Sequence, residues 1–149
     1  MSGQVKVAVV GCGYWGPNLV RNFHQLPTAD LVSCCDTDPQ NLDRIKALYP
    51  TVRTTVSYAE VLADGEIEAV ALATPARIHH ELARDALLAN KHVFVEKPLA
   101  MSSEEAEELI ALAQEHNRTL MVGHVFEYNP AVLKIKELVD EGQIGQVYY

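Results

Sequence analysis

The chain has 149 residues, of which 48% are hydrophobic and 21% charged, a composition typical of a globular domain that can bury a core. Twelve basic and twenty acidic residues give a net charge of -8, which argues against nucleic acid and membranes as partners, because their phosphates would be repelled. No apolar run approaches the roughly 20 residues needed to cross a bilayer. The three cysteines, Cys12, Cys34 and Cys35, show no disulfide spacing, so we expect a cytoplasmic protein.

Short β-rich runs alternate along the chain with segments of helical periodicity. In chain order, strands are expected over residues 5–10, 31–35, 51–55, 69–73, 92–95 and 119–122. Helices are expected over residues 15–25, 57–62 and 76–89, and further helices begin at Asp38-Pro39, at Ser102 and at Asn129-Pro130. An N-cap residue followed by proline favours a helix start, Ser102 with Glu105 fits a capping box, and Gly142 is expected to end the last helix.

This alternation predicts an α/β fold of the Rossmann type, a doubly wound, mostly parallel sheet with helices on both faces. Residues 1–123 are expected to form this dinucleotide-binding domain. Residues 124–149 are expected to form a linker helix and, over 145–149, the first strand of a C-terminal substrate domain that lies beyond this chain.

A glycine-rich turn, Gly11-Cys12-Gly13-Tyr14-Trp15-Gly16, follows the first predicted strand and opens the first predicted helix. In this context the first glycine permits a tight turn, the second lets the backbone approach a pyrophosphate, and the third lets the helix pack close to the strand. Backbone N–H groups at the helix N-terminus then attract the phosphates. The alternative is a tight turn with a purely structural role.

Asp36 ends the second predicted strand, twenty residues after Gly16. A carboxylate at this place accepts hydrogen bonds from the ribose hydroxyls of adenosine and repels a 2′-phosphate. Asp38 adds negative charge and no arginine follows closely, so NAD is favoured over NADP. The alternative for Asp36 is a loop or helix-capping aspartate, a role that suits Asp38 better.

Three further groups follow predicted strands, at the edge of the sheet where ligands of this fold bind. Thr74-Pro75 ends the fourth strand and is expected to line the cofactor cleft, although the proline could simply start a helix. His79 and His80 lie in the first turns of that helix, where one could face the cleft and at least one is expected to be solvated. Glu96-Lys97 follows the fifth strand, where a lysine can hold a substrate hydroxyl or move its proton, or can be a solvated loop residue.

Three motifs occur in the order and spacing of one enzyme family: the glycine-rich turn, Glu96-Lys97-Pro98-Leu99-Ala100, and Gly123-His124-Val125-Phe126-Glu127-Tyr128-Asn129-Pro130. Together they resemble the glucose-fructose oxidoreductase, inositol dehydrogenase and MocA (Gfo/Idh/MocA) family over essentially the whole chain, with a leaning toward its nucleotide-sugar 3-dehydrogenase branch. The resemblance implies that Lys97 is the catalytic lysine, that Tyr14 and Trp15 lie near the nicotinamide end of the cleft, and that His124 lies near the substrate. From their positions after the strands, Glu96 is expected in the cofactor site and His79 near the substrate. The resemblance also implies a homo-oligomer for the full-length enzyme.

We therefore expect the NAD-binding domain of an oxidoreductase that moves a hydride between nicotinamide and a secondary alcohol of a sugar, a sugar nucleotide or a cyclitol. The 149 residues alone are expected to bind NAD without turnover. The alternatives are a non-catalytic NAD-binding module and an S-adenosylmethionine-binding domain. A catalytic role for Cys12 is disfavoured because no partner base is evident, and no histidine has metal-ligand spacing, so no metal is expected.

Overall fold

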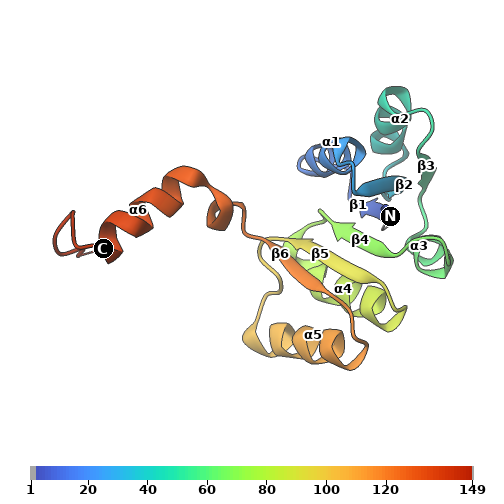
Figure 1. The fold of residues 1–149 in the computed structure, drawn as a ribbon. Helices are drawn as coiled ribbons and strands as arrows, with labels where there is room; N and C mark the ends of the chain where they lie inside the picture. Colours follow the sequence, from blue (N-terminus) through green and yellow to red (C-terminus); the bar gives the residue numbers. More distant parts are fainter. Residues whose placement is uncertain (1–2, 149) are drawn as a thin grey trace.

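The computed structural model describes residues 3–148, which contain one sheet of six parallel strands (Figure 1). The strands are β1 (Val5–Val10), β2 (Ala29–Cys35), β3 (Arg53–Thr55), β4 (Ala69–Leu72), β5 (His92–Glu96) and β6 (Leu120–Gly123). Their order across the sheet is β3-β2-β1-β4-β5-β6, and every pairing is parallel. This is the strand order of the Rossmann fold, so the predicted fold class is confirmed.

Helices α1 to α5 connect the strands, and α6 follows the last strand. They are α1 (Gly16–Gln25), α2 (Pro39–Leu48), α3 (Tyr58–Ala63), α4 (His79–Leu88), α5 (Ser103–Glu115) and α6 (Pro130–Asp140), with short 3-10 turns η1 (Ala76–Ile78) and η2 (Val125–Tyr128). The expected caps form: the side chain of Asp38 accepts from Gln40 N at 2.9 Å, and that of Ser102 accepts from Glu105 N at 3.2 Å. No helix within residues 3–148 is long and apolar enough to cross a membrane.

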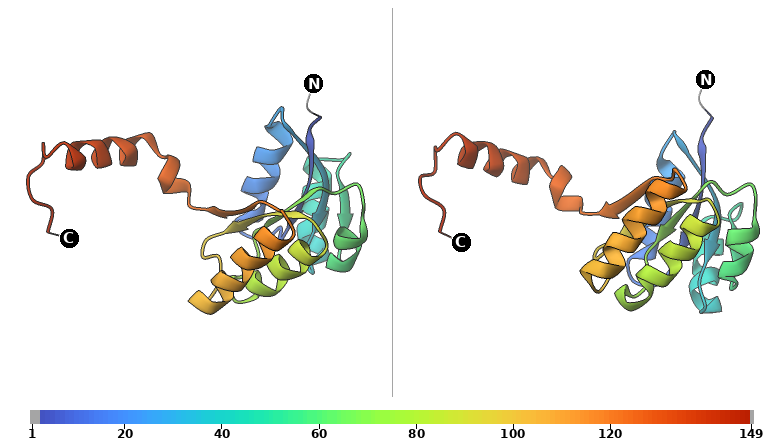
Figure 2. Two further views of the ribbon diagram at one scale, coloured as in Figure 1. Left: turned by 60° about the horizontal axis from the view of Figure 1, so that its bottom comes forward. Right: turned by 90° about the horizontal axis from the view of Figure 1, so that it is seen from below.

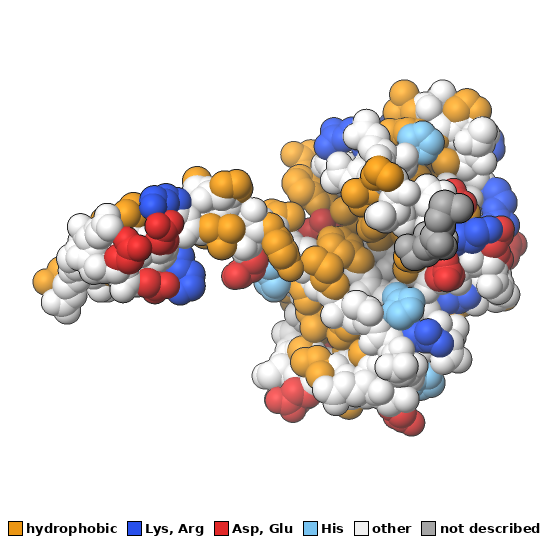
Figure 3. Space-filling model, viewed as in Figure 1, with side chains coloured by type: hydrophobic (Ala, Val, Ile, Leu, Met, Phe, Trp, Pro, Cys, Tyr) orange, Lys and Arg blue, Asp and Glu red, His pale blue; other side chains and the backbone are white. Residues whose placement is uncertain are grey.

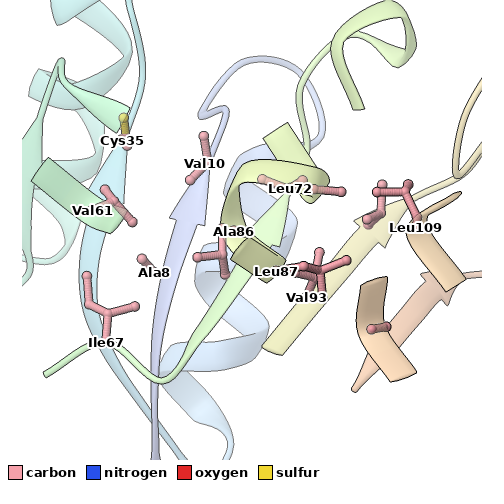
Figure 4. Close-up of a cluster of buried hydrophobic side chains, with 14 residues drawn as sticks. Ala8, Val10, Cys35, Val61, Ile67, Leu72, Ala86, Leu87, Val93 and Leu109 are labelled. Carbon is pink, nitrogen blue, oxygen red and sulfur yellow. The ribbon is translucent and has the colours of Figure 1, made fainter. Parts of the chain in front are cut away.

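The helices cover the two faces of the sheet in two groups (Figure 2). Side chains alternate between the faces of a strand, so Val7 and Val9 pack with α1 and α2, while Ala8 and Val10 pack with α3, α4 and α5. Figure 4 shows the second of these clusters, in which side chains of the central strands meet those of α3 to α5. Two buried apolar layers thus hold the strand ends, and the loops that follow them, in fixed positions.

The structure differs from the expected elements at their ends. β2 begins at Ala29, two residues early, because Ala29 and Asp30 pair with the start of β1. The helix expected over 76–89 is divided into η1 and α4. Residues 145–148, part of the strand expected over 145–149, form no strand here, because no second strand of the described chain pairs with them; Tyr149 lies outside the described residues, and the first strand of a further domain stays a prediction.

The last helix stands apart from the sheet. α6 projects away from the other elements (Figure 1), and none of its residues is buried. Hydrophobic side chains are exposed along the segment that leads into it (Figure 3), among them Phe126 and Tyr128. This geometry suits a segment that leaves the first domain at Gly123, and the division of the chain at residues 123 and 124 remains a prediction.

Candidate functional site

The carboxyl ends of the strands form a cleft with two connected cavities. The larger, of about 480 Å³, lies over the ends of β1, β2 and β4, and the smaller, of about 450 Å³, lies over β5 and β6. Tyr14, Trp15, Ala73 and Thr74 line both. The chain reverses its direction of winding between β1 and β4, which is the place where open α/β sheets bind their ligands.

The three glycines of the turn after β1 serve different purposes. Gly11 has a φ of 89°, and a Cβ there would lie 2.8 Å from the carbonyl group of Ala73. A Cβ at Gly16, which is buried, would overlap the carbonyl oxygen of Gly11. At Gly13 a Cβ would meet nothing within 4 Å, and this exposed residue lines the larger cavity. Gly11 and Gly16 are therefore required by the fold, whereas Gly13 leaves backbone open toward the cavity.

Asp36, directly after β2, is held by the backbone on both sides. Its Oδ2 accepts from Cys12 N at 2.6 Å and its Oδ1 accepts from Asp38 N at 2.8 Å. The first bond ties the end of β2 to the glycine-rich turn. Asp36 also lines the larger cavity, while Asp38 caps α2, so the two aspartates have separate roles.

Apolar side chains that the sequence analysis did not identify form the wall of the larger cavity opposite the glycine-rich turn: Val56, Tyr58, Ile78 and Leu82. The Tyr58 hydroxyl donates to the carbonyl oxygen of Leu82 at 2.6 Å, and burial raises the pKa of Tyr58, so the phenol stays neutral. These residues follow β3 and β4 in the sequence. Val56 and Tyr58 lie just beyond the end of β3, and that position could have identified them, whereas Ile78 and Leu82 lie farther along, in η1 and α4.

The smaller cavity joins the glycine-rich turn to the end of β5. Trp15 Nε1 donates to Glu96 Oε1 at 2.6 Å, and Glu96 is buried. A Cβ at Gly123 would lie 3.2 Å from Glu96 Oε2, so the glycine at the end of β6 leaves room for this carboxylate. Lys97 lines the same cavity with an exposed side chain, and no ion pair involving it occurs within residues 3–148. Its ammonium group is thus available to a ligand.

The turn after β4 lies where the cavities meet. Thr74 lines both, and its hydroxyl Oγ1 is buried without a hydrogen-bond partner among the described residues. Such buried polar atoms are rare in folded proteins and call for a partner. Pro75 lines the larger cavity, as expected for a residue of the cleft, and also precedes η1.

The two histidines expected near the substrate have different surroundings. His79 is 1% exposed, both its ring nitrogens lie against backbone carbonyl oxygens, and it lines neither cavity, so its place near the substrate stays a prediction. His124 is exposed directly after β6; its neighbours Gly123 and Val125 line the smaller cavity, but His124 itself does not. Its role near the substrate stays a prediction.

The cysteines near the turn are buried thiols. A hydrogen bond with Cys34, together with burial, raises the pKa of Cys12, and burial raises the pKa of Cys35 to about 12. Thiols with raised pKa values are poor nucleophiles. Within residues 3–148 no group of three or more potential metal ligands is assembled.

Comparisons with known proteins agree with this geometry. The model of the Gfo/Idh/MocA oxidoreductase family, described as having an NAD-binding Rossmann fold, matches residues 5–124. The chain is 32% identical over 145 residues to 1-carboxy-3-chloro-3,4-dihydroxycyclo hexa-1,5-diene dehydrogenase of Comamonas testosteroni, covering 97% of this chain and 36% of that protein.

Two solved structures are similar over nearly the whole chain. GenD2 from gentamicin A biosynthesis, in complex with NAD, has a TM-score of 0.90 and 32% identity, with 96% of this chain and 41% of that chain covered. KijD10, a 3-ketoreductase from Actinomadura kijaniata in complex with NADP and TDP-benzene, has a TM-score of 0.88 and 26% identity, with 94% and 43% covered. The chain thus spans about two fifths of the length of these relatives.

Proposed function

The chain belongs to the Gfo/Idh/MocA oxidoreductase family, whose NAD-binding Rossmann domain it contains, and we propose that it binds NAD in preference to NADP. We further propose that it serves an enzyme that transfers a hydride between nicotinamide and a secondary alcohol of a sugar, a sugar nucleotide or a cyclitol. The observation that carries this proposal is the pairing of open backbone at Gly13 with the anchored Asp36 carboxylate in one cavity of about 480 Å³.

The residues of the cleft fit a dinucleotide. Gly13 leaves space for a pyrophosphate beside the N-terminus of α1, where backbone N–H groups attract anions. The apolar wall around Tyr58 suits an adenine ring, and the partnerless Thr74 hydroxyl would gain a hydrogen bond at the junction of the two cavities. The cofactor would therefore lie across both cavities, with the nicotinamide in the smaller one.

Charge favours NAD over NADP. The Asp36 carboxylate can accept hydrogen bonds from ribose hydroxyls, and it would repel a phosphate on the same ribose. Among the described residues that line the larger cavity, none is lysine or arginine, so nothing there offsets that repulsion.

Lys97 is the residue proposed to contact the reacting oxygen of the substrate. When bound, the nicotinamide supplies the hydride acceptor or donor. In the oxidation direction the neutral Lys97 amine would accept the hydroxyl proton while the hydride leaves the same carbon for the nicotinamide, and in the reduction direction the Lys97 ammonium would donate a hydrogen bond and then its proton to the carbonyl oxygen as the hydride arrives. The Glu96 to Trp15 bond holds the wall next to this lysine in place.

The names of two relatives support the proposed substrate class: one is named for a cyclic diol, and the other is a 3-ketoreductase solved with TDP-benzene. The smaller cavity is open beside Phe126, whose side chain is 70% exposed, so these residues alone do not enclose a substrate. We therefore propose that the 149-residue chain binds cofactor without turnover and that the complete enzyme is a homo-oligomer.

Calorimetry with NAD, NADP and S-adenosylmethionine tests the proposal. We expect NAD to bind at least about tenfold more tightly than NADP, a difference of about 1.4 kcal/mol, and S-adenosylmethionine not to bind. Binding of S-adenosylmethionine without NAD would reverse the cofactor assignment. Dehydrogenase activity of the 149 residues alone, with any cyclitol or sugar, would contradict the proposed lack of turnover.

A further inference from the structure

His79 occupies the first position of α4 and is almost completely buried, with 1% of its surface exposed. Its Nδ1 lies 2.7 Å from the carbonyl oxygen of Pro98, and its Nε2 lies 2.7 Å from the carbonyl oxygen of Thr74. A carbonyl oxygen only accepts hydrogen bonds, so each ring nitrogen has to donate. A neutral imidazole has one N–H, and its other nitrogen would direct a lone pair at a carbonyl oxygen. Only the doubly protonated ring satisfies both contacts.

The two carbonyl groups belong to different walls of the cleft. Thr74 follows β4 and lines both cavities, whereas Pro98 directly follows Lys97, which lines the smaller one. β4 and β5 are neighbours in the sheet, so the contacts of the His79 ring join the two adjacent loops that follow these strands. The separation between the Thr74 wall and the Lys97 wall is thereby fixed through one side chain.

The surroundings of His79 contain no ion-pair partner for it within residues 3–148, whereas the adjacent His80 pairs with Glu108 at 3.0 Å. The nearest acid along the β5 loop, Glu96, is bonded to Trp15 instead. A charge on the ring would have the two carbonyl oxygens as its partners, and hydrogen bonds from a charged donor are shorter and stronger than neutral ones.

We propose that His79 is a positively charged positioning residue that clamps the loops after β4 and β5 at the spacing required by the nicotinamide half of the cofactor. It touches neither cofactor nor substrate and acts through Thr74 and Pro98. The proposal rests on the proposed NAD site for its functional consequence. The protonation of the ring is a property of the free protein and can be measured separately.

Nitrogen NMR of the chain labelled with ¹⁵N-histidine at neutral pH tests the protonation, and a His79→Asn variant assigns the resonances. We expect the His79 ring to show two N–H groups, both slow to exchange with solvent because the ring is buried. One N–H and one unprotonated ring nitrogen would overturn the proposal. This measurement needs only the unaltered fold, so it decides the question even where the variant fails to fold; the assignment then comes from three-dimensional spectra of the unaltered chain.

NAD binding by the His79→Asn variant tests the positioning role, with His80→Asn as the matched control one position along the same helix. Asparagine can reach only one carbonyl, so we expect NAD to bind about tenfold more weakly, equivalent to 1.4 kcal/mol. The control is expected to bind as the unaltered chain does. A folded His79→Asn variant with unchanged affinity would refute the clamp. If the unaltered chain itself does not bind NAD, the proposed function fails, and the NMR result still decides the charge of the ring.

Discussion

Replacing Gly13 with alanine is expected to weaken cofactor binding without destabilising the fold. Gly13 is exposed, lines the larger cavity, and has space for a Cβ with nothing within 4 Å. Its backbone is also outside the left-handed region that excludes other residues. The fold therefore gives no reason for glycine at this position, and the approach of a ligand to the backbone does.

The expected effects of Gly13→Ala on the free energy of unfolding and on NAD affinity have opposite signs. Gly13→Ala should leave the free energy of unfolding unchanged or raise it by about 0.4–1 kcal/mol, because alanine restricts the unfolded chain. It should weaken NAD binding by about tenfold or more, since the methyl group occupies space required by the pyrophosphate. Gly16→Ala differs, because its Cβ would overlap the carbonyl oxygen of Gly11; overpacking of this kind costs about 1–3 kcal/mol or more.

Urea unfolding and calorimetry with NAD measure both quantities on the same preparations. Gly65→Ala is the matched control, because a Cβ there also meets nothing within 4 Å and Gly65 lines neither cavity. We expect the control to match the unaltered chain in NAD affinity. The reasoning is refuted if Gly13→Ala binds NAD within about twofold of the unaltered chain, which corresponds to only about 0.4 kcal/mol.

Three other changes test separate parts of the structure. Asp36→Ser should weaken NAD binding about tenfold and strengthen NADP binding, measured by calorimetry with both, because it removes the carboxylate that accepts from ribose and repels phosphate. Trp15→Phe should lower the free energy of unfolding, measured by urea unfolding, by about 1–3 kcal/mol, because it leaves the buried Glu96 carboxylate without its donor. The control Tyr14→Phe, at a residue 96% exposed, should leave this free energy unchanged. Burial lowers the pKa of Lys91 from 10.5, so just below pH 10.5 the unfolded state binds more protons than the folded state. The free energy of unfolding, measured in urea at several pH values, should therefore rise with pH in that range, and this rise should be absent in Lys91→Met.

Much of the fold could be predicted because its determinants are local. The turn from Gly11 to Gly16 and the Asp38 cap are fixed by residues within a few positions of each other, and they form as predicted. The start of β2 at Ala29 is different, because it depends on pairing with β1. Pairing also explains the absent strand near the C-terminus: Val147 and Tyr148 have strand propensity, but a strand requires a neighbour.

The cleft was predicted less completely, because its contacts join distant parts of the chain. Trp15 and Glu96 are 81 residues apart, and no local pattern indicates that the indole N–H reaches the carboxylate. His79 was placed near the substrate from its position at the start of a helix. Whether a side chain there points to the cleft or under the loops depends on how α4 packs against β4 and β5, which the sequence pattern does not specify.

The same long-range contacts explain how the cleft can be ready for a ligand before one binds. The Asp36 bond to Cys12 N joins the end of β2 to the glycine-rich turn, and the bond from Trp15 to Glu96 joins that turn to the end of β5. His79 joins the β5 loop to the turn after β4. Each loop is thus tied to another by a polar contact that is at least partly buried, and binding need not order them. A preorganised site loses less conformational entropy on binding, so loss of any one tie should weaken NAD affinity as well as the fold.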